Sequence, residues 1–304
     1  MELISNYMRD DAKRHMLNAL TQKTFGFDFE GWVTNGYFEG DYIPYSFVKD
    51  GEIIANVSAN RMQFLQNGVR KNYIQIGTVM TDERFRKQGL AAQLMKHVIS
   101  EYESACDGIY LFGNLGATGF YEKLGFQTVN EYRYFVKDEY LTGEKAKDSF
   151  LPAGEMGPDI RKKYMELVRT GAVQSSFEQI NKFGLQMFYT AWFDNVYYAK
   201  DIDCFIVLNL DERTALQSVI SEERVPLKEV LRRLDLSALT EEAGAAEQSA
   251  TSALQLGFTP LPEDRELCVS ELYDGADDYR LFYRGEELKS IEREQLYFPE
   301  LSHA

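Results

Sequence analysis

The sequence of 304 residues is long enough for two domains, and a hydrophobic content of 44% supports buried cores. The formal net charge of −15 argues against a nucleic acid or an anionic membrane as a partner and mildly favours cationic ligands. Because there is no apolar run of about 18 residues and the three cysteines lie far apart, we expect a cytoplasmic protein without a membrane span or a disulfide framework. The oligomeric state is left open.

An aromatic and acidic segment, residues 25–32, comes early in the chain. It holds four candidate ligand-binding residues: Asp28, Phe29, Glu30 and Trp32. Aromatic faces and carboxylates together attract a cationic amine, so this segment is a candidate for the acceptor side of a binding site. The alternative is that its aromatic side chains are core residues and its two acids are solvated.

Residues 42–80 are expected to form three consecutive antiparallel strands. Asp50-Gly51 and Asn67-Gly68 separate runs of strand-forming residues. Asp-Gly and Asn-Gly between apolar runs are the strongest short signals for a hairpin. The sequence therefore predicts a meander in this region.

A basic turn and an amphipathic helix follow the meander. Leu90, Leu94 and Val98 recur at helical spacing, which predicts a helix over residues 88–103. A helix N-terminus offers free N–H groups and a partial positive charge, and Gly89 lets a ligand approach the backbone. The turn is therefore a candidate diphosphate site, although a plain turn with solvated basic side chains is the alternative.

The order of residues in this turn favours the diphosphate site over the plain turn. The run Arg86-Lys87-Gln88-Gly89-Leu90-Ala91 resembles the R/Q-x-x-G-x-G/A signature of the GNAT acyltransferase superfamily, with Ala91 in place of the last glycine. In that family the turn holds the pyrophosphate of coenzyme A, so these six residues are candidate cofactor-binding residues.

A second motif follows in the order that the family has. A buried strand is expected at residues 109–112, a helix at 116–124 and a strand at 127–136. Within them, residues 120–126 resemble the F/Y-Y-x-K-x-G-F segment of the family. The resemblance thus covers about residues 1–137.

The resemblance implies acetyl-CoA as the donor. It places the donor along the backbone of Val79, Met80 and Thr81, and it makes Tyr121 the general acid for the leaving thiolate. Asn114 matches a position that contacts the coenzyme arm. The alternatives are that Tyr121 is a packing residue and that Asn114 caps a helix.

The general base is not visible in the sequence, because the fourth strand carries no acid on the relevant face, and a water relay is expected. The three histidines have no metal-ligand spacing, so no metal is expected. Residues 296–304 are unusually aromatic for the end of a sequence and are expected to dock. In relatives resembling the Eis group the terminal carboxylate serves as the base, so we hypothesise that Ala304 or His303 lies near Tyr121.

The second half of the sequence reads as a degenerate copy of the first. Residues 219–225 echo residues 79–85, and residues 254–258 echo residues 122–126, which aligns Ala253 with Tyr121.

The copy is expected to lack a coenzyme A site. Pro226 stands where Arg86 does and has no N–H group to donate. Glu229 replaces Gly89, and its carboxylate would repel a pyrophosphate.

We therefore expect a mixed α+β fold of two tandem GNAT-like domains, each a mostly antiparallel mixed sheet flanked by helices. The expected divisions are a catalytic domain at 1–137, a connector at 138–157 and a degenerate domain at 158–304. The expected function is an acetyl-CoA-dependent N-acetyltransferase in which a small amine or a peptide amine attacks the thioester directly in a ternary complex. A non-catalytic acyl-CoA sensor or partner-binding module is the alternative, and a tRNA-dependent aminoacyl transferase is disfavoured by the acidic charge.

Overall fold

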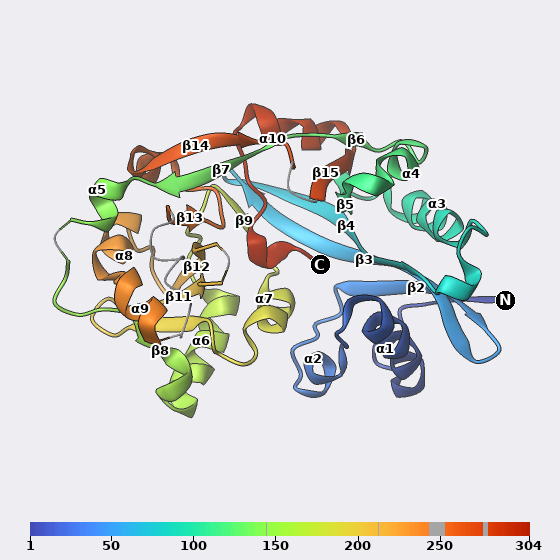
Figure 1. Ribbon diagram of the computed structural model, residues 1–304, viewed down its shortest axis with the longest axis horizontal. Helices are drawn as coiled ribbons and strands as arrows, with labels where there is room; N and C mark the ends of the chain where they lie inside the picture. Colours follow the sequence, from blue (N-terminus) through green and yellow to red (C-terminus); the bar gives the residue numbers. More distant parts are fainter. Residues whose placement is uncertain (144, 212, 243–252, 276–278) are drawn as a thin grey trace.

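The computed structural model describes residues 1–143, 145–211, 213–242, 253–275 and 279–304. Its strands form two sheets that lie side by side (Figure 1). The first sheet has the order β1 (Glu2–Ser5), β2 (Tyr42–Lys49), β3 (Glu52–Gln66), β4 (Val69–Thr81), β5 (Gly108–Asn114), β15 (Tyr279–Arg284), β6 (Gln127–Thr128), with β9 (Phe177–Gln179) also paired to β3. The second has the order β14 (Cys268–Tyr273), β7 (Glu131–Val136), β13 (Gln255–Leu256), β12 (Ala215–Ser221), β11 (Cys204–Asn209), β10 (Val196–Ala199), β8 (Leu151–Pro152).

The two sheets repeat one pairing pattern. In each, antiparallel strands lead to a single parallel step, β4 to β5 in the first sheet and β12 to β13 in the second. Two further antiparallel strands then follow. Both sheets are thus mixed and mostly antiparallel, which confirms the expected fold class.

The sheets also exchange one strand each. β15, from near the end of the chain, lies between β5 and β6 of the first sheet. In return, β7 lies between β13 and β14 of the second sheet. The division at residues 137 and 158 stays a prediction, and strands cross it in both directions.

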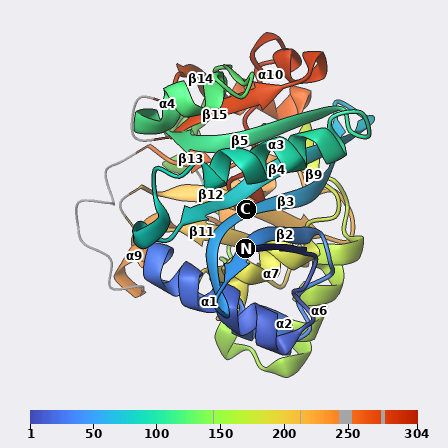
Figure 2. The same cartoon turned by 90° about the vertical axis from the view of Figure 1, so that its right-hand side faces the viewer.

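Helices cover both faces of each sheet (Figure 2). The helices of the first half are α1 (Asp11–Phe25), α2 (Glu30–Thr34), α3 (Leu90–Tyr102), α4 (Thr118–Glu122) and α5 (Asp138–Leu141). Those of the second half are α6 (Pro158–Thr170), α7 (Phe183–Thr190), α8 (Leu227–Arg233), α9 (Leu236–Glu242) and α10 (Ser290–Arg293). In the first sheet, α3 packs on one face, whereas α1 and α2 lie on the other.

The expected meander is confirmed, since β2, β3 and β4 pair as antiparallel neighbours. The glycine at each hairpin tip has a positive φ, +82° at Gly51 and +83° at Gly68, which glycine adopts without steric cost. The expected helix over 88–103 is confirmed as α3, whose buried face includes Leu94 and Val98.

Two expected elements differ from the structure. The strand expected over 127–136 is broken, because β6 and β7 belong to different sheets. The helix expected over 116–124 begins as a 3-10 turn at Leu115–Ala117 before α4.

The second of the two sequence echoes is also wrong as an alignment. Leu256 lies in β13, which takes the place of β5, whereas Leu124 follows α4 and precedes β6. Ala253 is therefore not the counterpart of Tyr121. After α9, residues 243–252 lie outside the described part of the chain.

The end of the chain docks between the two sheets (Figure 1). Phe298 is fully buried, with its ring stacked on that of Tyr110 at 4.3 Å. Its N–H group donates to Glu131 Oε1 at 2.9 Å. These contacts fix the path of residues 299–304 toward the centre of the molecule.

Candidate functional site

The site begins where β4 and β5 part. Their parallel pairing runs from Tyr73 with Gly108 to Gln75 with Tyr110 and then ends. Beyond this point the two strands border a cavity of about 260 Å³. The cavity is lined by Phe25, Gln75, Ile76, Gly77, Thr78, Val79, Leu111, Phe112, Gly113, Asn114, Tyr121, His303 and Ala304. A thin substrate arm can thus lie along the unpaired edge of β4.

The β4 backbone is distorted in this cavity at Thr78. The register with β3 shifts between Asn56 and Ser58, and Thr78 has a φ of +40°, which is unusual for a β-branched residue. Four polar contacts hold it. The Tyr42 hydroxyl lies 2.7 Å from Thr78 Oγ1, and the Asn56 amide donates to the Thr78 carbonyl at 3.0 Å and to its hydroxyl at 3.1 Å. The hydroxyl also lies 2.9 Å from Ser58 Oγ.

The basic turn leads from the end of β4 into α3. Residues 86–89 are exposed, whereas Leu90 is buried and anchors the start of the helix. Lys87 and Gly89 have positive φ values of +64° and +75°. A Cβ at Gly89 would meet nothing within 4 Å, so the backbone conformation is what favours glycine here and the space above it is open.

The two arginines at this turn differ in their partners: Arg84 is paired with acids, whereas Arg86 lies at the start of the helix. Arg84 is bound by Asp82, at 2.9 Å from Nε, and by Glu52, at 2.7 Å from a terminal nitrogen. Hydrogen bonding to Arg84 holds the pKa of Asp82 well below its usual range. Arg86 is exposed and donates to the Thr81 carbonyl at 3.3 Å, so it lies at the start of the helix.

Tyr121 reaches the same cavity from α4. Its ring is buried against Phe282 of β15, with centroids 5.1 Å apart, and against Gly113, where a Cβ would come within 2.7 Å of the ring. Burial raises the pKa of its phenol. Asn114 also lines the cavity, and its Oδ1 accepts a hydrogen bond from the Gly116 N–H at 2.7 Å. Asn114 therefore acts as the cap that we considered as its alternative role.

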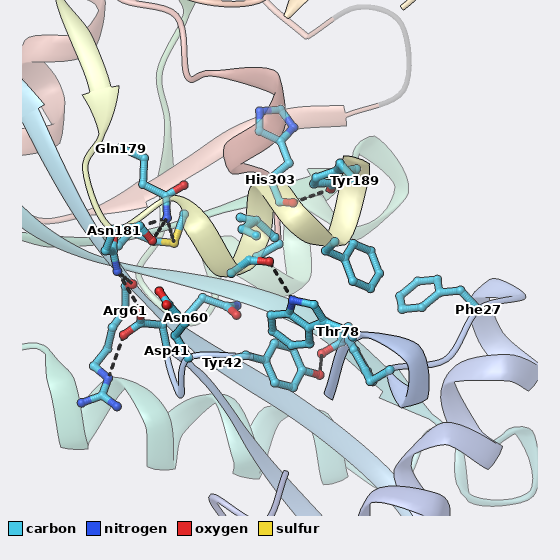
Figure 3. Close-up of a pocket in the computed structure, with 18 of the residues that line it drawn as sticks. Phe27, Asp41, Tyr42, Asn60, Arg61, Thr78, Gln179, Asn181, Tyr189 and His303 are labelled. Carbon is cyan, nitrogen blue, oxygen red and sulfur yellow. Dashed lines mark hydrogen bonds and ion pairs between the residues drawn. The ribbon is translucent and has the colours of Figure 1, made fainter. Parts of the chain in front are cut away.

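A second and larger cavity of about 370 Å³ adjoins the first (Figure 3). It is lined by Phe25, Phe27, Phe29, Trp32, Glu39, Asp41, Tyr42, Asn60, Arg61, Met62, Thr78, Gln179, Asn181, Gly184, Leu185, Phe188, Tyr189, His303 and Ala304. Both halves of the sequence thus contribute to its walls.

The two cavities share a wall of four residues: Phe25, Thr78, His303 and Ala304. The His303 ring stacks on Phe112 with centroids 3.9 Å apart, and the Tyr189 hydroxyl donates to the His303 carbonyl. Burial lowers the pKa of His303 to about 4, so its side chain is neutral at pH 7. The wall therefore carries no positive charge from this histidine.

The structure places the predicted acceptor residues in two groups. Phe29, Trp32 and Ala304 line the larger cavity. Asp28 and Glu30 line neither cavity, which corrects their expected position. Glu30 accepts two hydrogen bonds from Arg14, at 2.9 and 2.8 Å, while Asp28 accepts one from the Glu30 N–H at 2.9 Å. The two acids therefore stabilise the junction between α1 and α2.

The sequence analysis missed the residues of the second half at this cavity. Asn181, Phe188 and Tyr189 come from α7 and the segment before it. In the sequence they belong to an apolar run that is typical of a buried helix, and no local signal separates them from core residues. Glu39 and Asp41, the two acids that line this cavity, lie in the segment before β2.

No group of three or more histidine, cysteine or acidic side chains among the described residues is placed to hold a metal ion. No helix in the described part is both long enough and apolar enough to cross a membrane.

Residues 7–126 match the acetyltransferase (GNAT) family. The search of curated proteins gave no significant match. In fold, the chain is similar to a conserved protein of Enterococcus faecalis described as a probable N-acyltransferase, with a TM-score of 0.54 and 11% identity over 96% of this chain and 74% of that one.

Two further solved structures show the same fold. A GCN5-related N-acetyltransferase from Kribbella flavida has a TM-score of 0.53 and 16% identity over 94% of this chain and 72% of that one. Eis1 from Mycobacterium abscessus has a TM-score of 0.53 and 10% identity over 92% and 73% of the two chains. At these identities the likeness establishes the fold, and it extends over both sheets.

Proposed function

Residues 7–126 of this chain match the acetyltransferase (GNAT) family, and from this premise we propose that the protein is an acetyl-CoA-dependent N-acetyltransferase. The coarser function, acyl transfer from an acyl-CoA, follows from the family. The acetyl donor, the primary amine acceptor and the residue roles below are our proposal. We place the reaction in the cytoplasm, where Cys106, Cys204 and Cys268 remain thiols.

The donor is held at two places. The exposed turn of residues 86–91 binds the pyrophosphate through the free N–H groups at the start of α3, where the helix dipole favours an anion. The pantetheine arm lies in the smaller cavity, along Val79–Thr81 and beside Asn114. Backbone N–H groups of the parted β4 edge polarise the thioester oxygen, and one such donor is worth roughly 3 kcal/mol in the transition state.

Tyr121 assists the leaving group. Its buried phenol is protonated at neutral pH, because burial raises its pKa further. It donates to the coenzyme A thiolate as the carbon–sulfur bond breaks, while the amine nitrogen forms the new amide bond. Since a thiol has a pKa of about 8.5, a hydrogen bond to the thiolate suffices without full proton transfer.

The amine approaches from the larger cavity. It crosses the shared wall at Thr78 and attacks the thioester directly in the ternary complex. The ammonium form loses one proton to water along the polar side chains of the larger cavity, such as Asn60, before the attack. The neutral amine then attacks and loses its second proton by the same route as the amide forms and the thiolate leaves. Neutral His303 in the wall does not repel the approaching cation.

The second half supplies walls and no second donor site. α8 begins directly after Pro226, which offers no N–H group. Glu229 in its first turn is paired with Arg233 at 2.8 Å and carries the negative charge that a pyrophosphate would meet. We therefore propose one active site per chain, completed by α7 and by residues 303 and 304.

One observation carries the proposal: the cavity at the parted edges of β4 and β5 reaches Tyr121 and shares a wall with a second, ligand-sized cavity. Tyr121→Phe tests it by acetyl-CoA turnover over a panel of amines. We expect kcat to fall roughly 10²-fold, as for loss of a general acid, with coenzyme A binding retained in calorimetry.

Tyr132→Phe is the matched control, because Tyr132 packs in the core of the second sheet. Unchanged turnover of Tyr121→Phe would remove its role. Coenzyme A binding by the parent protein without turnover of any amine would instead favour the alternative function, a non-catalytic acyl-CoA sensor.

A further inference from the structure

The larger cavity presents aromatic faces whose polar tips are already bound. Trp32 donates its indole N–H to the Gly184 carbonyl at 2.7 Å. The Tyr42 hydroxyl is held at Thr78, and the Tyr189 hydroxyl at the His303 carbonyl. A ligand in the cavity therefore meets ring faces and edges here, with these polar groups turned to the protein.

Phe188 is at the centre of this aromatic wall. Its ring contacts those of Phe27 at 5.6 Å, Trp32 at 5.8 Å and Phe29 at 6.1 Å. Phe29 in turn contacts Tyr42 at 4.8 Å. Because Phe188 and Tyr189 come from α7 and the other rings from the first half, the aromatic wall exists only in the assembled fold.

Polar groups gather at the other end of the same cavity. In Figure 3, Asp41, Arg61 and Asn181 lie together, away from Phe27. Asp41 accepts a hydrogen bond from Asn181 Nδ2 at 3.0 Å and lies 3.8 Å from Arg61 Nε. The nearby Glu39 is paired with Arg169 at 2.9 Å. The two acids at this end are therefore paired with protein groups, whereas Gln179 Oε1 is a buried acceptor without a protein partner. The aromatic end is the part built for the body of a ligand.

We propose that the acceptor is a primary amine carried on a flat apolar body, such as an arylalkylamine. This inference rests on the proposed function, because the amine must reach the shared wall at Thr78. The rings hold the apolar body and attract the ammonium form through their faces. An amino sugar would press its hydroxyl groups against rings that offer them no partner, and a polyamine has no flat body to fill the wall.

The chain offers a direct binding probe for this cavity. It has two tryptophans, Trp32 in the wall and Trp192, which is 86% exposed. Trp192→Phe therefore leaves Trp32 as the single tryptophan, whose emission can be excited selectively over that of the tyrosines, without touching the cavity. In this background, 2-phenylethylamine is titrated without acetyl-CoA, and spermidine and kanamycin are titrated in parallel.

We expect a saturable change in Trp32 fluorescence with 2-phenylethylamine at concentrations at least tenfold below those needed for the two polar amines. Phe188→Leu should weaken this binding at least tenfold. Phe27→Leu removes a ring that contacts Phe188 and should also weaken this binding, by a smaller factor. Phe47→Leu is the control, because Phe47 packs against the α3 face of the first sheet, outside the cavity.

The same amines are then compared by kcat/KM with acetyl-CoA. Preference for 2-phenylethylamine in both assays supports the inference. Turnover that favours spermidine or kanamycin would overturn it and leave the acetyltransferase function standing. Fluorescence binding of 2-phenylethylamine without turnover of any amine would support the ligand class while overturning the acetyl-transfer function.

Discussion

A main-chain oxygen of Ala304 packs so closely on Gly77 that a Cβ added at residue 77 would lie 2.6 Å from it. The same added atom would lie 3.1 Å from Asn60 Nδ2. Glycine at this position of β4 therefore lets the last residue form the wall between the two cavities.

Gly77→Ala should displace residues 303 and 304 from that wall. Because a misplacement of about 1 Å at a reacting centre can cost roughly 10²-fold in rate, we expect a kcat loss of that order with a modest change in melting temperature. Turnover and thermal unfolding measure the two effects. Gly31→Ala is the control, since its Cβ would meet only Asn35 Nδ2, at 3.9 Å. Equal activity of the two variants would contradict a role for the wall.

Asn56→Ala should release the strained backbone of Thr78. Asn56 is fully buried and its amide holds both the carbonyl and the hydroxyl of Thr78. Leaving these buried groups without their donor should lower the free energy of unfolding by about 1–3 kcal/mol, as urea denaturation can measure. We also expect kcat to fall more than KM for acetyl-CoA rises. A stability loss without any change in kcat would show that Thr78 has no part in alignment.

Gly89→Glu should block the donor turn. Its backbone has a φ of +75°, so any Cβ adds strain, and the carboxylate adds repulsion at the pyrophosphate. We expect KM for acetyl-CoA to rise at least tenfold, together with a matching loss of coenzyme A binding in calorimetry. Gly89→Ala separates the causes, because it carries the strain without the charge. Unchanged binding in Gly89→Glu would exclude this turn as the pyrophosphate site.

Glu131 should make stability depend on pH. It is 3% exposed, and burial raises its pKa to about 7 from the model-peptide value of 4.5, although the Phe298 N–H partly opposes this. The folded state thus binds the proton more tightly than the unfolded state. The contribution of Glu131 to the free energy of unfolding must therefore fall as the pH rises from about 4.5 to 7, by roughly 3 kcal/mol, and level off above that range.

Glu131→Gln removes this titration while keeping an oxygen that can accept from Phe298. We expect the variant to gain stability relative to the parent as the pH rises from 5 to 8, as measured by urea denaturation at each pH. Glu122→Gln removes an exposed carboxylate and should follow the parent curve. Parallel curves for the parent and Glu131→Gln would refute the prediction.

The part of the fold that the sequence predicted correctly is local. The meander of β2 to β4 was visible in its two glycine turns, and α3 in its apolar spacing. The strand expected over 127–136 failed because its two pieces, β6 and β7, pair in different sheets. Local pattern shows that a segment is extended, and it does not show which partner the segment will find.

The predictions for the candidate site were likewise correct for some residues and wrong for others. Phe29 and Trp32 lie at the larger cavity, as the aromatic segment predicted. Their side chains suit either a core or a binding wall, so the sequence alone did not choose between the two. Asp28 and Glu30 looked equally suitable, but Arg14 lies one helix away and binds Glu30. The two acids that do line the cavity, Glu39 and Asp41, were not recognised, because an isolated carboxylate before a strand carries no distinguishing signal in the sequence.

By itself the sequence determined the elements whose geometry is set by near neighbours: the hairpins, the basic turn and the helix that begins at Leu90. Only the tertiary structure decided the strand exchange and the cavity walls. Those depend on contacts between distant residues, such as the Trp32 indole on the Gly184 carbonyl and the Phe298 N–H on Glu131. The physical reason is that burial and hydrogen bonding choose among many compatible partners, and that choice is made only when the whole chain is packed.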